Sequence, residues 1–124
     1  MDTRAKILNA GQARDILRRN GLRIAVVSGH FDPLLAAHPE RLEQVRETAG
    51  ALLVVVTDPP RPILGARGRA ELVAGLKAVD YVVAAQDDPE ASALVAAAIH
   101  EEQADAQRLA ELIGRVQARQ AAGI

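Results

Sequence analysis

One loop of the sequence gathers the groups best suited to hold a phosphate. It runs Ser28-Gly29-His30-Phe31-Asp32-Pro33-Leu34-Leu35-Ala36-Ala37-His38. It leads from a predicted strand into a predicted helix, and such a turn directs backbone N–H groups and a helix dipole at one point. Gly29 would let an anion approach the backbone closely, and His38 could donate a hydrogen bond to it. The loop therefore predicts an anion site.

The same residues also allow interpretations without a ligand. His38 could bind phosphate, or it could be an exposed or capping histidine at the start of a helix. Asp32 could cap the following helix or hold the loop, while His30 is best explained as a loop histidine. Ser28 has no His or Asp at a spacing typical of an activated nucleophile, so we assign it no nucleophilic role.

A basic cluster follows the second predicted strand. Arg61, Arg67 and Arg69 could clamp a phosphate, or they could be solvated residues around the start of a helix. His100 lies at the end of a predicted helix, where a cation suits the dipole. The three histidines and the carboxylates lack metal-ligand spacing, so no metal site is predicted.

Strands and helices that alternate along the chain would position these residues. Short apolar runs rich in β-branched residues predict buried strands, and apolar residues at helical spacing predict helices. Such alternation is typical of a three-layer, Rossmann-like α/β fold with a parallel sheet, in which ligands bind at the carboxyl ends of the strands. The predicted strands are 24–27, 52–56 and 81–84, and the predicted helices are 13–20, 36–48, 66–76, 88–99 and 101–120.

Composition narrows the class of protein. The 124 residues are 49% hydrophobic and 25% charged, which suits a single domain over residues 1–124 with one core. A net charge of -1 and 2% aromatic residues argue against nucleic-acid binding. No leader pattern or apolar run of membrane length is visible, so we expect a cytoplasmic protein without membrane contact.

The loop resembles that of the cytidylyltransferase-like nucleotidyltransferases, which reads G-x-F-D-x-x-H-x-G-H. The resemblance covers residues 6–99 and is nearest to the adenylyltransferase domain of ADP-heptose synthase, with glycerol-3-phosphate cytidylyltransferase more distant. Other stretches match in order: Lys6-Ile7-Leu8, Arg61-Pro62-Ile63, Arg69-Ala70-Glu71-Leu72 and Leu76-Lys77-Ala78-Val79-Asp80-Tyr81-Val82-Val83.

The resemblance implies an activity and a set of residues. The family transfers a nucleotidyl group from a nucleoside triphosphate to a phosphorylated sugar or alcohol and releases pyrophosphate. The resemblance also implies Mg²⁺ with ATP or CTP, no tightly bound cofactor, and a sugar phosphate as partner. The implied catalytic residue is His38, and the implied nucleotide- or phosphate-binding residues are Ser28, Gly29, Phe31, Asp32, His38 and Arg61.

Several departures from the family pattern fall on the chemistry. The first motif histidine is Leu35 here and the motif glycine is Ala37, so the motif reads Leu35-Ala36-Ala37-His38. The loop after the second strand, Asp58-Pro59-Pro60-Arg61, contains no lysine, and no Ser or Thr follows Ser92. Loss of one transition-state donor typically costs about 10²–10³ in rate. We therefore expect nucleotidyl transfer to be weak or lost.

The sequence also predicts a short sheet of about three strands, without the last two strands of the family. The strand at residues 24–27 would then be an unpaired edge, which proteins usually cover or pair. Either the helix at residues 101–120 covers it or a second subunit does, and we expect a homodimer. The alternative function is a non-enzymatic dimeric remnant that acts as an interaction or regulatory subunit.

Overall fold

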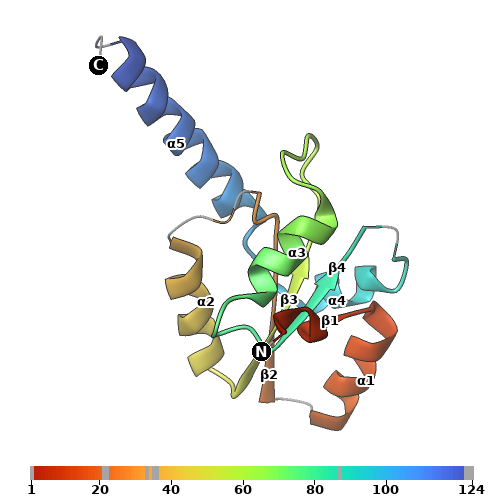
Figure 1. The fold of residues 1–124 in the computed structure, drawn as a ribbon. Coiled ribbons are helices and arrows are strands. Elements are labelled where there is room, and N and C mark those ends of the chain that lie inside the picture. The colour runs from red at the N-terminus through yellow and green to blue at the C-terminus, as the bar shows by residue number, and fades with distance from the viewer. Residues whose placement is uncertain (1, 21–22, 33, 35–36, 87, 122–124) are drawn as a thin grey trace.

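A computed structural model describes residues 2–20, 23–32, 34, 37–86 and 88–121 (Figure 1). Helices and strands alternate along most of the chain, as predicted. The elements are η1 (a 3₁₀ helix, Thr3–Lys6), β1 (Ile7–Leu8), α1 (Ala10–Asn20), β2 (Ile24–Gly29), α2 (Ala37–Glu47), β3 (Ala51–Val56), α3 (Ala66–Ala74), β4 (Tyr81–Ala84), α4 (Ala91–Ala97), β5 (Ile99–His100) and α5 (Glu102–Ala121).

The strands form one parallel sheet in the order β1-β4-β3-β2-β5. The three central strands, β2, β3 and β4, are those predicted from the apolar runs. The interiors of β3 and β4 are fully buried, since Leu52, Val54, Val55 and Val82 have essentially no exposed surface, and β2 is buried from Val27 onward. A strand buried on both faces needs apolar residues throughout, which is why these runs do not alternate with polar residues.

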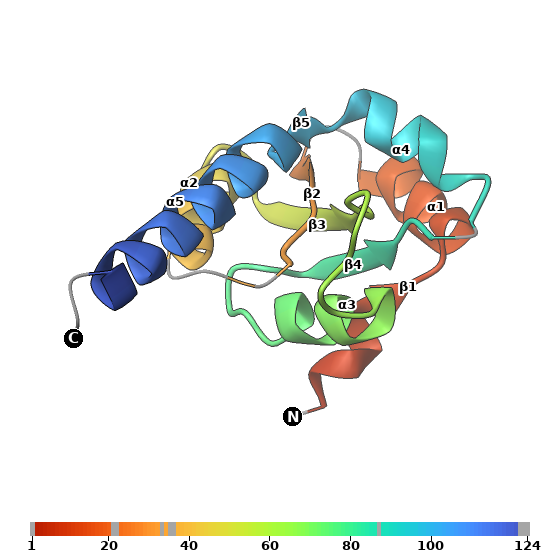
Figure 2. The same ribbon diagram turned by 90° about the horizontal axis from the view of Figure 1, so that it is seen from above.

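Helices cover both faces of the sheet, so the predicted three-layer Rossmann-like α/β fold is confirmed (Figures 1 and 2). One core cluster joins the sheet to α2 and α3 through Leu42, Val45 and Val73. The other joins it to α1 and α4 through Ala13 and Leu94. Val, Leu and Ala supply nearly all of this core, in keeping with the 2% aromatic content.

The predicted number of strands is wrong, because two further strands of two residues each lie at the sheet edges. β1 pairs with β4, and β5 pairs with β2. Val27 and Ser28 lie opposite Ile99 and His100, so the edge of β2 is paired at its carboxyl end. Two residues show no periodicity, and Ile99–His100 was predicted to end a helix and lead into the next one.

One predicted helix boundary needs correction. The helix expected at residues 88–99 is α4, and it begins three residues later than predicted. The Ala10 N–H donates to the Asp88 carboxylate at 3.0 Å, so this side chain caps the start of α1, and the Glu90 N–H also donates to it. On α3, Leu72 is 49% exposed, whereas Val73 is fully buried.

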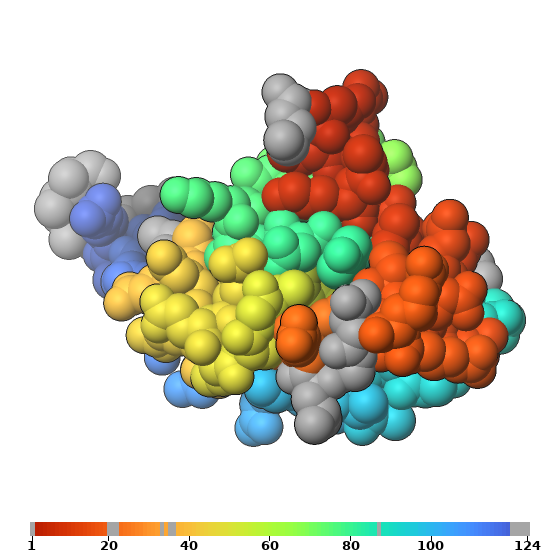
Figure 3. All heavy atoms as spheres, turned by 90° about the horizontal axis from the view of Figure 1, so that it is seen from below, coloured from red at the N-terminus to blue at the C-terminus, as the bar shows by residue number. Residues whose placement is uncertain are grey.

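The last helix, α5, leaves the body of the molecule. Its first turns lie beside β2, and the remainder projects beyond the sheet (Figures 1 and 2); the space-filling view also shows its end beyond one side (Figure 3). Residues 111–119 are all exposed, including Leu112, Ile113 and Val116. Among the described residues no helix has the length and apolar character needed to span a membrane.

Candidate functional site

The end of β2 turns sharply into the predicted anion loop. Gly29 closes the strand, and Phe31 takes a left-handed backbone conformation with φ of 50°. Such a conformation is uncommon outside glycine and often marks a functional turn. The Phe31 ring is buried and packs on the His38 ring at a centroid distance of 4.9 Å. This contact fixes the start of α2 against the turn.

Three donors converge beyond this turn, and we call them the cradle: the N–H groups of His30 and Phe31 and the Nε2 atom of His38. All three meet the carboxylate of Asp105, which comes from α5. The His30 N–H donates to Asp105 Oδ2 at 2.8 Å, and the Phe31 N–H approaches the same oxygen at 3.5 Å. His38 Nε2 lies 2.5 Å from Asp105 Oδ1. The cradle therefore holds an anion supplied by the chain itself.

The electrostatics of Asp105 fit an ionised carboxylate. Burial on its own would raise the pKa of Asp105, but hydrogen bonding and charge attraction from His38 outweigh burial, with help from the His30 and Phe31 N–H groups, and lower this pKa. An ionised carboxylate can only accept hydrogen bonds, so His38 Nε2 carries the hydrogen. Arg108 Nη1 adds a further cation at 3.2 Å from Oδ1.

Gly29 makes room for this anion. A Cβ atom at this position would lie 2.8 Å from Asp105 Oδ2 and 2.7 Å from the Phe31 ring. Both distances are shorter than real Cβ contacts, so any larger residue would displace the carboxylate or the ring. The close approach that the sequence predicts at Gly29 is therefore made, and the group that approaches is Asp105.

The acidic start of α5 fastens the helix to the sheet. We call Glu101, Glu102 and Asp105 the acidic anchor. Glu101 pairs with Arg41 at 2.6 Å. Glu102 accepts hydrogen bonds from two hydroxyl groups, each at 2.9 Å: that of Ser28, near the end of β2, and that of Thr57, directly after β3.

Ser28 has partners that spacing did not reveal. His100 Nδ1 lies 2.9 Å from Ser28 Oγ, on the strand next to it. The hydroxyl proton of Ser28 goes to Glu102, so the imidazole donates to Oγ and does not act as a base. Ser28 is also fully buried. The cluster pins β5 to β2 and does not form a nucleophile.

A cavity of about 240 Å³ adjoins the cradle. On one side α5 lines it with Leu109 and Ile113, and on the other side lie His30 and Arg61. Asp32 lines it too, but both of its oxygens accept N–H groups, from Ile63 at 2.5 Å and Leu64 at 2.7 Å. Asp32 thus holds the loop after β3, and it does not cap α2.

The three arginines of the basic cluster have different surroundings. Arg69 is 1% exposed and donates to the carbonyl groups of His30, Thr57 and Leu64 and to the Asp58 carboxylate. It ties two loops together from inside, which neither sequence interpretation anticipated. Arg67 pairs with Glu71 on the surface of α3. Arg61 is exposed at the cavity.

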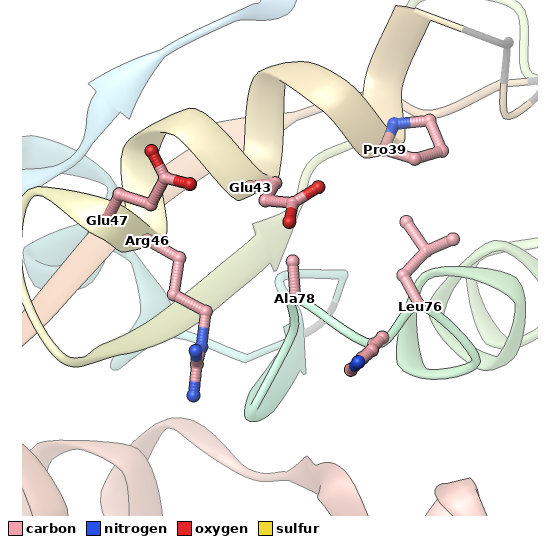
Figure 4. A pocket seen from close by; sticks show the side chains of 7 residues that line it. Pro39, Glu43, Arg46, Glu47, Leu76 and Ala78 are labelled. Carbon is pink, nitrogen blue, oxygen red and sulfur yellow. The ribbon is translucent and has the colours of Figure 1, made fainter.

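A separate cavity of about 350 Å³ lies between α2 and the connection from α3 to β4. Glu43, Arg46 and Glu47 line it from α2, opposite Leu76 and Ala78 (Figure 4). Segments of α2 and of this connection lie against each other on the face seen from below (Figure 3). The cavity contains none of the predicted site residues, so we do not assign the activity to it.

The structure brings together Gly29, Phe31 and His38 around one anion position, with Asp32 and Arg61 at the adjoining cavity. Ser28 points instead to β5 and α5. Leu35 and Ala36 lie outside the described residues, and Ala37 is the exposed first residue of α2. The acidic anchor was not predicted from the sequence. Its signal is the acidic run Glu101-Glu102 followed by Asp105 one turn later, ahead of the apolar stripe of α5.

Comparison with known proteins gives relatives for part of the chain. No protein-family model matches. A bifunctional protein HldE of Ectopseudomonas mendocina is 40% identical over 83 residues, 59% of this chain and 18% of the relative. The Granulibacter bethesdensis HldE is 37% identical over 63% of this chain and 19% of the relative. The Helicobacter acinonychis HldE is 30% identical over 69% of this chain and 20% of the relative.

The chain spans about a fifth of the length of the curated relatives it matches. These matches agree with the resemblance inferred from the loop and from the ordered stretches between residues 6 and 99. The similarity to the HldE proteins supports the resemblance of this chain to the cytidylyltransferase-like nucleotidyltransferases.

Proposed function

We propose that the chain binds the phosphate groups of a nucleotide or a sugar phosphate at the cradle, and that its nucleotidyl-transfer activity is weak or lost. The observation that carries the proposal is the convergence of His30 N–H, Phe31 N–H and His38 Nε2 on one acidic group. Carboxylate and phosphate both present charged oxygen acceptors, so donors that suit one suit the other.

The adjoining cavity would take the remainder of the ligand. Arg61, on the side of the cavity away from α5, offers a cation for a second phosphate. Arg61 would thus take the place of the lysine that the family carries after its second strand.

Two positions argue against efficient transfer. Leu35 stands where the family has its first motif histidine, and its side chain can neither donate a hydrogen bond nor carry charge. Ala37 stands where the family has a glycine. Catalysis requires interactions that strengthen in the transition state, whereas ligand binding does not. Loss of these groups therefore lowers transfer more than it lowers binding.

Magnesium would come with the nucleotide. Within the part of the chain that the structure describes, no group of three acidic or imidazole side chains could hold a metal ion. The oxygens of Asp32 and Asp105 are already engaged by N–H groups and His38. Mg²⁺ is commonly bound through substrate phosphates with few protein ligands, so its place here would be on the triphosphate.

Calorimetry with ATP, CTP and a sugar phosphate, each with and without Mg²⁺, tests the proposal. We expect weak binding in the millimolar range. Arg61→Gln should weaken it about two- to fivefold, the range of an exposed ion pair. Arg67→Gln, another exposed arginine outside the cavity, is the matched control and should have no effect. Absence of both heat and thermal shift at millimolar ligand would contradict the proposal.

A second candidate function rests on the exposed stripe of α5. Leu112, Ile113 and Val116 are 36%, 47% and 48% exposed. Two copies of α5 could pair antiparallel around Ile113, so that the stripe of each copy covers the stripe of the other. The chain would then be a non-enzymatic dimer that acts as an interaction or regulatory subunit.

Light scattering at micromolar concentration tests this candidate. We expect a dimer that Val116→Lys converts into a monomer, because a charge would be buried between the two paired helices. Ala118→Lys lies on the opposite face of the helix and should leave the dimer intact. A wild-type monomer at these concentrations would rule the candidate out.

A further inference from the structure

We infer that Asp105 is a built-in competitor for the cradle, so that a phosphate group can bind there only when the start of α5 withdraws. The inference rests on the proposed function, since it concerns the same donors. It adds a regulatory feature: the chain carries its own stand-in for the ligand, and occupancy of the site is coupled to the position of a helix.

The geometry makes the two anions mutually exclusive. Asp105 Oδ2 takes the His30 N–H at 2.8 Å, and Oδ1 takes His38 Nε2. The space left by the missing side chain of Gly29 is filled by the same carboxylate. No donor of the cradle remains for a second acceptor at that position. A phosphate must therefore replace the carboxylate and cannot bind beside it.

The charge of Asp105 also prevents a second anion from binding beside it. The Asp105 side chain is 4% exposed and ionised, and a second anion brought to within a few ångströms would be repelled in this poorly hydrated spot. A phosphate that displaced Asp105 would instead recover His38 and both N–H groups as partners. A polyphosphate carries more charge than one carboxylate, so it is the class of ligand that competes best.

The attachment of α5 suits such an exchange. Between residues 102 and 119, no apolar side chain is fully buried; the buried residue is Asp105. The acidic anchor holds the helix, through Arg41, Ser28, Thr57 and the cradle. Apolar docking is indifferent to anions, whereas charged contacts can be exchanged for contacts with another anion. The start of α5 can therefore leave without opening the core.

Calorimetry with inorganic pyrophosphate provides the first test, on wild type, Asp105→Asn and Glu111→Gln. The first variant keeps the size of the side chain and removes its charge. The second removes the same charge from an exposed position of the same helix. We expect Asp105→Asn to bind pyrophosphate about ten- to a hundredfold more tightly than wild type, because a neutral amide competes for the donors more weakly than a carboxylate and does not repel the incoming anion. Glu111→Gln should match wild type.

A second measurement uses the wild-type protein, in case Asp105→Asn fails to fold. The chain has three histidines, so their ¹⁵N ring signals can be resolved and assigned. Pyrophosphate should shift the signal of His38 Nε2 and the amide signals of His30 and Phe31. It should also speed hydrogen exchange in the first turns of α5, because that segment loses its attachment.

The outcomes separate this inference from the proposed function. Tighter binding by Asp105→Asn, together with faster exchange in α5, supports both. Equal affinity of wild type and Asp105→Asn, or binding that leaves exchange in α5 unchanged, overturns the inference and leaves the proposed function standing. No binding by any variant, with no shift of the His38 signal, overturns both.

Discussion

The two halves of α5 meet their surroundings in opposite ways. The first half places Asp105 and Glu102 against the carboxyl ends of β2 and β3, with its apolar residues partly exposed. The second half carries Leu112, Ile113 and Val116, which are 36%, 47% and 48% exposed, and of these Ile113 lines the cavity beside the cradle. Charge attaches the first half, whereas residues 111–119 are all exposed.

The other helices show what this difference means. α2 and α3 dock through Leu42, Val45 and Val73, all essentially buried, and removing them from the sheet would expose core. α5 docks through carboxylates that have partners in the cradle. A helix held in this way has a stability that depends on pH and on competing anions, whereas a helix held by apolar burial has neither dependence.

The largest expected effect comes from removing the central contact of the first half. Asp105→Ala removes the acceptor of His38 Nε2 and of the His30 and Phe31 N–H groups, which should lower the free energy of unfolding by about 2–4 kcal/mol. Urea denaturation measures this loss. Glu111→Ala in the second half should change the free energy of unfolding by less than about 0.5 kcal/mol.

Restoring the stability of Asp105→Ala with added anions provides a further test. If the cradle is an anion site, phosphate or acetate in the buffer should restore part of the stability lost in Asp105→Ala, because the added anion replaces the missing carboxylate. Chloride at equal ionic strength is the control. A loss of stability that phosphate, acetate and chloride leave equally unchanged would mean that the donors do not form a usable anion site.

The comparison also shows what could be predicted from the sequence. The central strands and their helices follow from apolar runs and helical spacing, so β2, β3 and β4 lie where predicted. β1 and β5 have two residues each, too few for any pattern, and they are strands because their neighbours offer a free edge. The glycine and the histidine of the loop were identifiable, because their distinctive side chains lie at a strand-to-helix turn.

The occupant of the loop could not be predicted, because Asp105 is 67 residues away from His38 in the chain. The sequence predicted that the helix at residues 101–120 covers the edge strand or leaves it to a second subunit, and it did not predict that this helix supplies an acceptor to the loop. Arg69 was missed for a related reason: an arginine at a helix start is usually solvated, and only the packing of two loops around it makes it internal. Contacts of this kind depend on tertiary placement and leave no local periodicity.

An effect of intermediate size is the pH dependence of the unfolding free energy. The pKa of Asp105 is lowered in the fold from its ordinary value of 3.8, so the ionised carboxylate stabilises the protein above that value, and this contribution is lost as the pH falls through the lowered pKa. The difference in unfolding free energy between wild type and Asp105→Asn should therefore shrink between about pH 5 and about pH 2. Denaturation of both proteins across this range measures it. A difference that stayed constant would mean that Asp105 is not ionised in the cradle.

The smallest effect tests whether the second half of α5 is coupled to the body at all. Gly114 lies in the exposed half, and an added Cβ would meet nothing within 4 Å. Gly114→Ala should favour the helix locally by about 1 kcal/mol. If this half is unattached, circular dichroism should show more helix while the urea midpoint stays the same, because global unfolding does not involve those residues. A higher midpoint that rises with protein concentration would instead indicate that a second copy holds the stripe.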